Sequence, residues 1–547
     1  MAEKSKSTEE IAETITKGYA FDSTCIELGA AMIDGEVVTD AKVRVPLSMM
    51  NRHGLVAGAT GTGKTKTLQL IAEQLSNNGV PVFLADIKGD LSGLLDPGEA
   101  NPKVDERAQK VGQTWAPQGF PVEFLALGGE GLGVPVRTEI SNFGPLLLSR
   151  VLELNETQEQ VLQLIFHYAD QKGLWLDDVK DLRTLITFLT SDAGKSELEG
   201  IGGVSKQSAD VILRALTTFE ASGADKFFGR PAFDPADLLK VDPSGKGVIT
   251  CLELAQQMGR PVLFSTFLMW LLAELFETLP EVGDADKPKL VFFLDEAHLL
   301  FTGASKAFLE SITQTVRLIR SKGVGVFFIT QTPKDVPGDV LAQLANRVQH
   351  ALRAFTPEDA KALKATVTTF PKSDYDLEEV LPACGIGEAV ITVMSDRGAP
   401  TPVAWTMLRA VESKMAPADE TEIQARIDAS ELKPKYATED DRESAYEMLT
   451  AKAAQEAAAA QAGADAAAAQ EAENQRIRAE AEAAAQAAKE QAAAEKAAAK
   501  SSKSSRSRKE DESMVEQVLS SSTTKSVINT ATREIMRSIF GTGRRRR

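Results

Sequence analysis

The chain has 547 residues, a hydrophobic content of 43% and a formal net charge of −17. It is long enough for two or three regions, and its hydrophobic content is ample for a globular body. Its acidity argues against a general nucleic-acid binder, because non-specific affinity comes from Lys and Arg on phosphates, but it does not exclude binding through a locally basic surface.

Cysteine usage and the N-terminus bear on the cellular compartment. Cys25, Cys251 and Cys384 lie far apart without C-x-x-C spacing, which argues against a zinc site or a disulfide framework and for a reducing compartment. The N-terminus is polar, and no run of eighteen uncharged apolar residues occurs in the sequence. We therefore predict a cytoplasmic protein whose residues 1–20 are flexible.

Residues 21–139 carry the first part of an expected core domain. A short apolar strand at 55–58 leads into Gly-Ala-Thr-Gly-Thr-Gly-Lys-Thr and then into a helical pattern. In such a phosphate-binding loop, backbone N–H groups surround the phosphates, Lys64 reaches the β and γ oxygens, Thr65 ligates Mg²⁺, and the following helix N-terminus faces the anion. The nucleotide-binding residues that we expect are Gly58, Ala59, Thr60, Gly61, Thr62, Gly63, Lys64, Thr65 and Lys66.

Further apolar runs predict the rest of a sheet. Strands are expected at 80–86, 122–127, 247–252, 290–295 and 323–330, with further candidates at 347–355, 388–394 and 403–408. Their alternation with helical patterns predicts an α/β fold with a mostly parallel sheet.

Residues 140–245 have a helical pattern. Asn155 followed by Gln158 predicts a capped helix start. Because the strands on both sides belong to one sheet, we expect an α-helical insertion in the ATPase domain rather than a separate helical domain.

Residues 246–410 form the second part of the expected core. The apolar run at 290–295 ends in Asp295 and Glu296, at the edge where a parallel sheet presents its carboxyl ends. We expect Asp295 to hold Mg²⁺ partly through water and Glu296 to polarise the attacking water; the alternative for Glu296 is a solvated strand end. The two motifs together predict an ATPase that uses ATP and Mg²⁺.

The composition changes in the C-terminal part. Within 411–512, residues 451–500 are mostly Ala, Glu, Gln and Lys, which favour helix but cannot bury a core or form a coiled-coil seam. We predict a charged, Ala-rich helical spacer. Residues 513–547 form a basic amphipathic tail, which could dock on the chain's own core, on nucleic acid or on an anionic membrane.

Several motifs resemble the HerA and FtsK group of hexameric DNA-pumping ATPases with RecA-like cores. Residues 85–90, Ala-Asp-Ile-Lys-Gly-Asp, are similar to that group's Asp-x-x-Gly-acid motif. Residues 329–333, Ile-Thr-Gln-Thr-Pro, resemble its Gln-x-Pro sensor, and residues 316–323 resemble its basic helix before the sensor strand. The resemblance is greatest to the bacterial HerA-like proteins and extends from about residue 29 to residue 408.

The resemblance implies roles for further residues. Gln331 would sense the γ-phosphate, and Asp86 would be a further metal ligand. Arg317, Arg320 or Arg353 would reach the nucleotide of a neighbouring subunit, although a surface arginine is more often solvated or ion-paired.

Two departures from known patterns matter. HerA begins with a β-barrel, whereas 57 residues precede the loop here, enough for a strand or two at 25–45. This leaves open whether a nuclease partner of the NurA type docks. Residues 295–298 also spell the Asp-Glu-Ala-His box of two-domain RNA helicases, but nothing after residue 408 resembles their second domain.

Three functions compete on these grounds. The first is a homohexameric, Mg²⁺-dependent ATPase that acts as a DNA translocase or helicase, which the basic residues of 317–322 favour. The alternative is a protein- or membrane-associated P-loop ATPase that does not act on DNA. A nucleotide-switched scaffold is the third, and Glu296 argues against it, because a switch does not require a well-placed base.

Overall fold

The computed structural model describes residues 7–198, 202–257, 261–283, 285–301, 304 and 306–501. It divides into two units, Met1–Ala453 and Ala454–Arg547. Among the described helices, none has the length and apolar character that a membrane crossing requires. The basic tail predicted at 513–547 lies outside the described residues.

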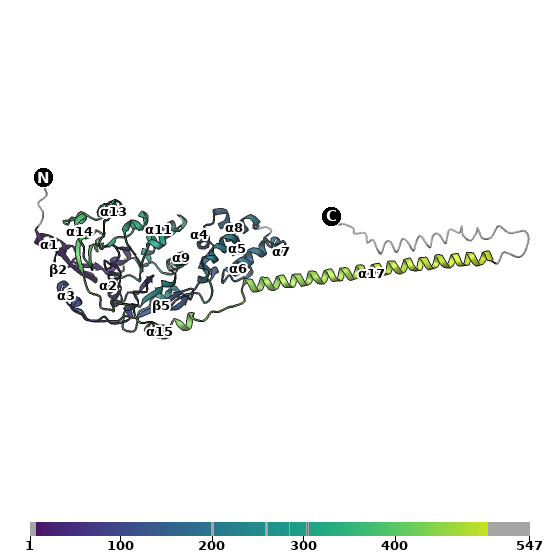
Figure 1. Ribbon diagram of the computed structural model, residues 1–547, viewed down its shortest axis with the longest axis horizontal. Helices are drawn as coiled ribbons and strands as arrows, with labels where there is room; N and C mark the ends of the chain where they lie inside the picture. Colours follow the sequence, from purple (N-terminus) through teal and green to yellow (C-terminus); the bar gives the residue numbers. More distant parts are fainter. Residues whose placement is uncertain are drawn as a thin grey trace, which may run out of the picture. The chain divides into compact units, whose positions relative to one another are not determined.

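One twelve-stranded sheet organises the first unit (Figure 1), in the order β2-β1-β12-β11-β10-β3-β9-β8-β4-β7-β5-β6. All neighbours from β10 to β6 in that order pair in parallel, and the four strands at the other side pair antiparallel. The strands are β1 (Cys25–Ile33), β2 (Glu36–Pro46), β3 (Gly54–Ala57), β4 (Val82–Asp86), β5 (Val122–Leu127), β6 (Val134–Val136), β7 (Ile249–Glu253), β8 (Leu290–Leu294), β9 (Val324–Thr330), β10 (Asn346–Gln349), β11 (Glu388–Thr392) and β12 (Ala404–Leu408). The α/β fold with a mostly parallel sheet is therefore confirmed.

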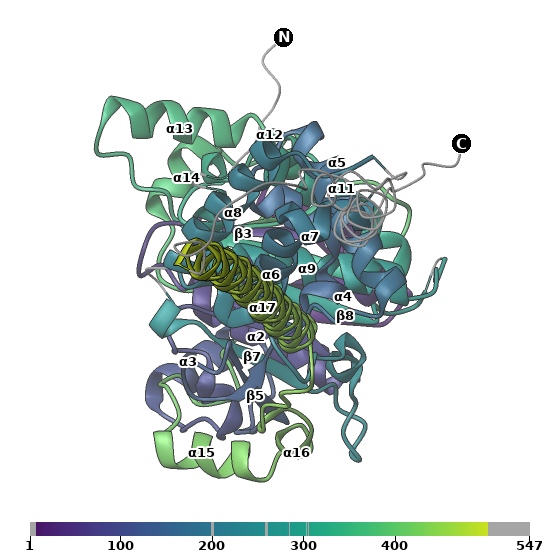
Figure 2. The same cartoon turned by 90° about the vertical axis from the view of Figure 1, so that its right-hand side faces the viewer.

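Helices cover both faces of the sheet. Figures 1 and 2 place α11 and α13 on one side and α3 and α15 on the other. The helices are α1 (Thr8–Gly18), α2 (Lys64–Asn77), α3 (Pro102–Val111), α4 (Ile140–Val151), α5 (Glu156–Lys172), α6 (Val179–Thr190), α7 (Asp192–Lys195), α8 (Lys206–Ala221), α9 (Pro261–Thr278), α10 (His298–Phe301), α11 (Lys306–Ile319), α12 (Gly338–Leu341), α13 (Pro357–Val367), α14 (Leu377–Ala383), α15 (Glu420–Asp428), α16 (Lys433–Tyr436) and α17 (Ala445–Ser501).

The helices α4 to α8 occur between β6 and β7, which belong to the same sheet. The helix start predicted at Asn155 is confirmed: the Asn155 side chain accepts from the Gln158 N–H, and the Gln158 side chain accepts from the Asn155 N–H.

Burial explains why the central strands could be recognised as apolar runs. Every residue of β4, β5, β8 and β9 is buried, as expected for strands covered on both faces. A histidine supports this centre: the N–H of Val326 in β9 donates to Nδ1 of His53 at 3.0 Å. Burial lowers the pKa of His53 to about 4, so the ring is neutral near pH 7.

The prediction that residues 1–20 are flexible is wrong for the part that forms α1. Ile15 and Tyr19 are buried, and the Tyr19 hydroxyl lies 2.9 Å from the carbonyl oxygen of Pro402 and 3.1 Å from that of Ile391. These partners are distant in the sequence. The polar residues of the N-terminus therefore contain no pattern that predicts the contact.

The start predicted for the spacer, residue 411, is also too early in the sequence. Ile423 and Ile427 of α15 and Tyr436 of α16 are buried, and α15 packs on β5. The helix α17 begins at Ala445, and beyond Lys452 its described side chains are exposed.

The Tyr19 contact yields a stability prediction. Tyr19→Phe keeps the ring but removes a hydroxyl that lies between two carbonyl oxygens, one contact being buried and the other part-buried, so we expect a loss of about 1 kcal/mol in the free energy of unfolding. Urea denaturation measures it. Thr218→Ala, which removes an exposed hydroxyl from α8, should change the free energy by no more than about 0.5 kcal/mol. Equal effects from both variants would contradict the role of Tyr19.

Candidate nucleotide-binding and hydrolysis site

The candidate site lies at the carboxyl edge of the parallel strands β3, β9 and β8. The phosphate loop follows β3, Gln331 follows β9, and Asp295 follows β8. These strands are neighbours, and the N–H of Gly58 in the loop donates to the carbonyl oxygen of Thr330 at 3.2 Å. The sheet thus brings together residues that are far apart in the sequence.

Three glycines give the loop its course. Gly58, Gly61 and Gly63 have φ values of +156°, +79° and +110°, which favour glycine over other residues. A Cβ added at Gly58 would also lie 2.4 Å from Cβ of His350. The helix α2 then begins at Lys64 without a side-chain cap, so its first N–H groups point toward the position expected for phosphate oxygens.

Lys64 is positioned over the loop. Its ammonium donates to the carbonyl oxygens of Gly58 at 2.7 Å and Ala59 at 3.2 Å. Burial lowers the pKa of Lys64, and the nearby carboxylates of Glu296 and Asp295 oppose this shift. The loop and the two acids therefore belong to one site within a single copy of the chain.

His350 packs against the phosphate loop and was missed by the sequence analysis. Its Nε2 lies 2.8 Å from Oγ1 of Thr67, and its Nδ1 lies 2.9 Å from the carbonyl oxygen of Glu388. Burial lowers its pKa to about 4, so the neutral ring donates from Nδ1 and accepts the Thr67 hydroxyl at Nε2. The partners of this histidine lie on other strands and helices, so no pattern around residue 350 in the sequence identifies its role.

Asp295 has the properties of a magnesium ligand. It is 3% exposed, and its Oδ1 accepts from the Glu296 N–H at 2.9 Å. Its Oδ2 is buried and has no hydrogen-bond partner among the described residues. Burial raises the pKa of Asp295 to about 6. An unpartnered, buried carboxylate oxygen beside the phosphate loop fits Mg²⁺, with Thr65 in the first turn of α2 as the second protein ligand.

Glu296 has an unusual backbone conformation, and its side chain contacts two neighbours. Its φ is +46°, which is uncommon for a residue with a side chain. Its Oε1 lies 2.5 Å from Nζ of Lys88, and its Oε2 lies 3.2 Å from Nδ1 of His298. Burial acts to raise the pKa of Glu296, but Lys88, His298 and Lys64 outweigh it and hold the pKa below its usual value. The side chain is therefore a carboxylate near pH 7, as a base for the attacking water must be.

Asp86 sits beside this pair in a different arrangement. Its Oδ1 accepts from the N–H groups of Lys88 and Gly89, and its Oδ2 accepts from that of Leu91. This geometry shapes the loop that carries Lys88, and it favours a structural role for Asp86 over the metal-binding role implied by the resemblance.

Comparison with known proteins now identifies the family. The family model of the helicase HerA-like C-terminal region matches residues 32–547. The chain belongs to the HerA-like helicase family. It is accordingly an ATP-hydrolysing P-loop enzyme.

The relatives and a solved structure match similar shares of this chain. The DNA double-strand break repair helicase HerA of Sulfurisphaera tokodaii is 23% identical over 374 residues, 68% of each chain. The protein of the same description from Sulfolobus acidocaldarius is 21% identical over 377 residues, again 68% of each. The bacterial conjugative coupling protein TrwB is 16% identical with a TM-score of 0.48, over 74% of this chain and 94% of that chain.

The other residues singled out from the sequence lie at two edges of the sheet. Gln331 directly follows Thr330, whose carbonyl accepts from the phosphate loop. Arg353 lies at the same edge, two residues after Ala351, and its guanidinium donates to the carbonyl oxygen of Pro382 at 2.5 Å. Arg317 lies in the last turn of α11 and Arg320 in the turn that follows it, before β9 begins at Val324, so parallel pairing places them near the opposite edge from their own phosphate loop.

The ion pair between Lys88 and Glu296 predicts a change in pH dependence. Lys88→Ala should raise the pKa of Glu296 and move the acid limb of the kcat profile to higher pH, because the base must be deprotonated. Steady-state ATPase rates between pH 4.5 and 8 measure the limb. Lys88→Arg retains the cation and should leave the limb close to its wild-type position. A limb unmoved in Lys88→Ala would show that Lys88 does not control Glu296.

Proposed function

We propose that this chain is a motor that moves along or pumps double-stranded DNA and acts as a homo-oligomeric ring, most simply a hexamer. The observation that carries the DNA part is its similarity, over 68% of each chain, to two archaeal DNA double-strand break repair helicases. The hydrolytic part is supported by the arrangement of Lys64, Asp295 and Glu296 in one copy of the chain.

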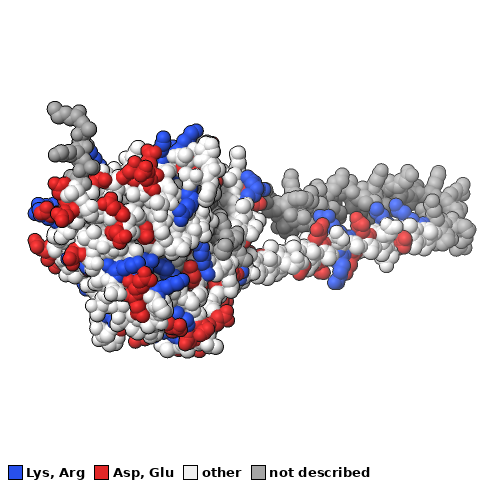
Figure 3. All heavy atoms as spheres, turned by 60° about the vertical axis from the view of Figure 1, so that its left-hand side comes forward, with Lys and Arg blue, Asp and Glu red and all other residues white. Residues whose placement is uncertain are grey.

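The surface charge is compatible with local contact to DNA. On the face of the first unit seen in Figure 3, acidic and basic side chains are interspersed, and a short band of Lys and Arg crosses its middle. A net charge of −17 therefore does not make the whole surface acidic. Local basic groups suffice for a motor, because only the groups near the phosphates neutralise them.

The topology also supports action between copies. Arg317 is exposed near the amino edge of the sheet, and the parallel strands separate it from the loop at the carboxyl edge. In the proposed ring, Arg317 or Arg320 of one copy neutralises charge at the nucleotide of the next, and Gln331 senses the γ-phosphate within its own copy. Arg353 is the third candidate, but its place beside its own loop favours it less.

Linear duplex DNA should stimulate the steady-state ATPase rate at low salt and do so less at moderate salt, because phosphate contacts weaken with ionic strength. Glu296→Gln should lower the DNA-stimulated rate by about 100-fold or more, the usual contribution of a general base. Glu13→Gln, at an exposed position on α1, is the matched control and should retain the rate. A Glu296-dependent rate that ignores DNA would count against the DNA motor and favour work on proteins or membranes.

Mixing two inactive variants tests the action between copies. Arg317→Ala and Arg320→Ala copies retain Glu296, and Glu296→Gln copies retain both arginines. If either arginine acts in trans, mixing the corresponding arginine variant with Glu296→Gln should recover part of the wild-type rate at interfaces that combine an intact base with an intact arginine. Mixtures as inactive as their components would exclude this role for both residues.

A further inference from the structure

Lys88 lies at the hydrolysis site with N–H donors that the chain does not use. Its Nζ lies 2.5 Å from Oε1 of Glu296, and within the described part of the chain this carboxylate is its one hydrogen-bond partner. An ammonium has three N–H donors. Since the side chain is 43% exposed, the two remaining donors can reach a ligand bound beside Glu296.

The loop that carries Lys88 has a fixed backbone. The buried carboxylate of Asp86 accepts from the N–H groups of Lys88 at 3.2 Å and of Gly89 and Leu91 at 2.8 Å. The preceding strand, β4, is the parallel neighbour of β8, so the loops that follow the two strands meet at the carboxyl edge. Lys88 therefore extends toward Glu296 from an anchored position.

Electrostatic effects place the same loop beside the start of α2, where the phosphates are expected. Burial lowers the pKa of Lys64, and the ammonium of Lys88 adds to that shift. Burial also lowers the pKa of Lys66, and the carboxylates of Asp90 and Asp86 oppose it. Because exposed charges more than about 10 Å apart are largely screened, these effects indicate that Lys88 and its loop lie close to the phosphate-binding residues.

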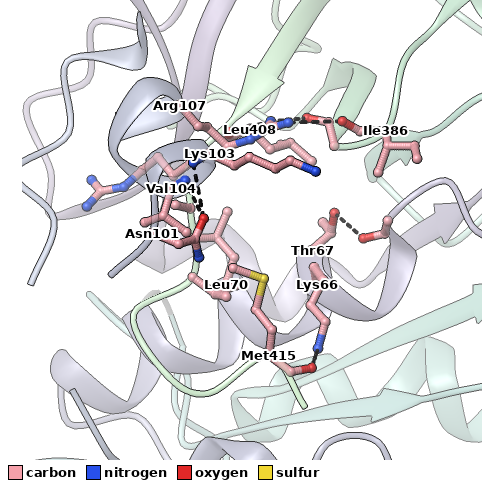
Figure 4. A pocket seen from close by; sticks show the side chains of 15 residues that line it. Lys66, Thr67, Leu70, Asn101, Lys103, Val104, Arg107, Ile386, Leu408 and Met415 are labelled. Carbon is pink, nitrogen blue, oxygen red and sulfur yellow. Dashed lines mark hydrogen bonds between the residues drawn. The ribbon is translucent and has the colours of Figure 1, made fainter. Parts of the chain in front are cut away.

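Lys66 is engaged differently, although it directly follows Thr65. Figure 4 shows its side chain directed at Met415, whose carbonyl oxygen accepts from Nζ of Lys66 at 2.5 Å. Oε1 of Gln69 accepts from the same ammonium at 2.9 Å. Lys66 is thus tied to the chain around α2, whereas Lys88 is tied to the base.

The hydrolysis reaction relates that base to the γ-phosphate. Glu296 must lie within hydrogen-bond reach of the attacking water, and that water must lie in line with the γ-phosphorus. One water molecule therefore separates the carboxylate from the γ-phosphate. An ammonium that already contacts the carboxylate can reach the γ oxygens by a movement of its flexible side chain alone.

We propose that Lys88 bridges Glu296 and the γ-phosphate, so that the side chain that holds the base also distinguishes ATP from ADP. One N–H stays on Oε1 of Glu296, and another donates to a γ oxygen. The bridge fixes the base relative to the phosphate that the water attacks. The inference rests on the assignments of the phosphate loop and of Glu296, and it does not depend on DNA as the substrate.

The bridge gives Lys88 a different role from that of Lys64. The lysine of a phosphate loop reaches both β and γ oxygens, so Lys64 contributes to the binding of ADP as well as ATP. Lys88 approaches from the loop after β4, on the side of the base, and its phosphate ligand is absent from ADP. Loss of the γ-phosphate leaves Lys88 with Glu296 alone.

The test measures two ligands on the full chain by isothermal titration calorimetry with Mg²⁺: ADP, and the β,γ-imido analogue of ATP, which is not hydrolysed. Lys88→Ala should raise the Kd of the analogue about tenfold, because a hydrogen bond between charged groups is lost, and leave the Kd of ADP within about twofold. Lys88→Arg keeps a cation and should retain most of the preference for the analogue. Equal changes for both ligands in Lys88→Ala, or no change for either, would overturn the contact.

A double substitution separates this contact from an indirect effect of charge. Removing Lys88 also leaves the Glu296 carboxylate unopposed, and that carboxylate alone could repel the γ-phosphate. A Glu296→Gln background removes this repulsion, and Lys88→Ala should still weaken the analogue about tenfold there. An analogue Kd that does not respond to Lys88→Ala in that background would show that Lys88 only screens Glu296.

Two further variants control for the fold and for the loop. Lys110→Ala removes a lysine with 51% side-chain exposure from α3 and should bind both ligands as the wild type does. Lys64→Ala should weaken both ADP and the analogue. If Lys64→Ala leaves both Kd values unchanged, the assignment of the loop fails, and this inference fails with it. A failure confined to the Lys88 variants overturns the bridge and leaves the loop assignment intact.

Discussion

Parallel pairing of β3 with β9 and β10 is the constraint on which the site depends. Parallel strands present their carboxyl ends at one edge, so residues that follow different strands converge there without any local sequence signal. The backbone bonds from Gly58 to Thr330 and from Ala59 to Ala351 fix the loop to both neighbouring strands. A shift of β9 against β3 would therefore change the position of Gln331 relative to the phosphate loop.

Asp295, Glu296 and Lys88 lie close together in a largely buried site, and their opposite charges stabilise one another. Burial acts to raise the pKa of both Asp295 and Glu296, because it disfavours their charged forms. The Lys88 ammonium offsets this for Glu296, whereas Asp295 keeps a raised pKa of about 6. The pKa values of the two adjacent carboxyl groups are thus shifted in opposite directions by their environments.

The sequence predicted the parts of the fold that have local causes. The buried strands are continuous apolar runs, the start of α5 carries its own capping box, and the phosphate loop is a contiguous motif with its glycines in place. Family membership is confirmed, whereas the roles of Gln331 and the arginines stay predictions.

The parts that were missed depend on distant contacts. The α1 helix is held through Tyr19 by carbonyl groups of Ile391 and Pro402, which are distant in the sequence, and residues 411–436 pack on the body although their composition is polar. His350 and Lys88 act through partners on other elements, so their spacing in the sequence carries no signal. Periodicity reports which face of an element is buried but not which neighbour buries it.

The two buried histidines, His53 and His350, have a consequence for the whole molecule in mild acid. Each has a folded pKa of about 4, below the value of 6.5 expected in an unfolded chain. Between these pH values the two histidines are protonated in the unfolded chain but neutral in the folded chain. The free energy of unfolding therefore falls as the pH drops through this window. One ring contacts the centre of the sheet and the other the phosphate loop. Mild acid therefore destabilises the fold through these two histidines at a pH above that at which most surface carboxylates become protonated.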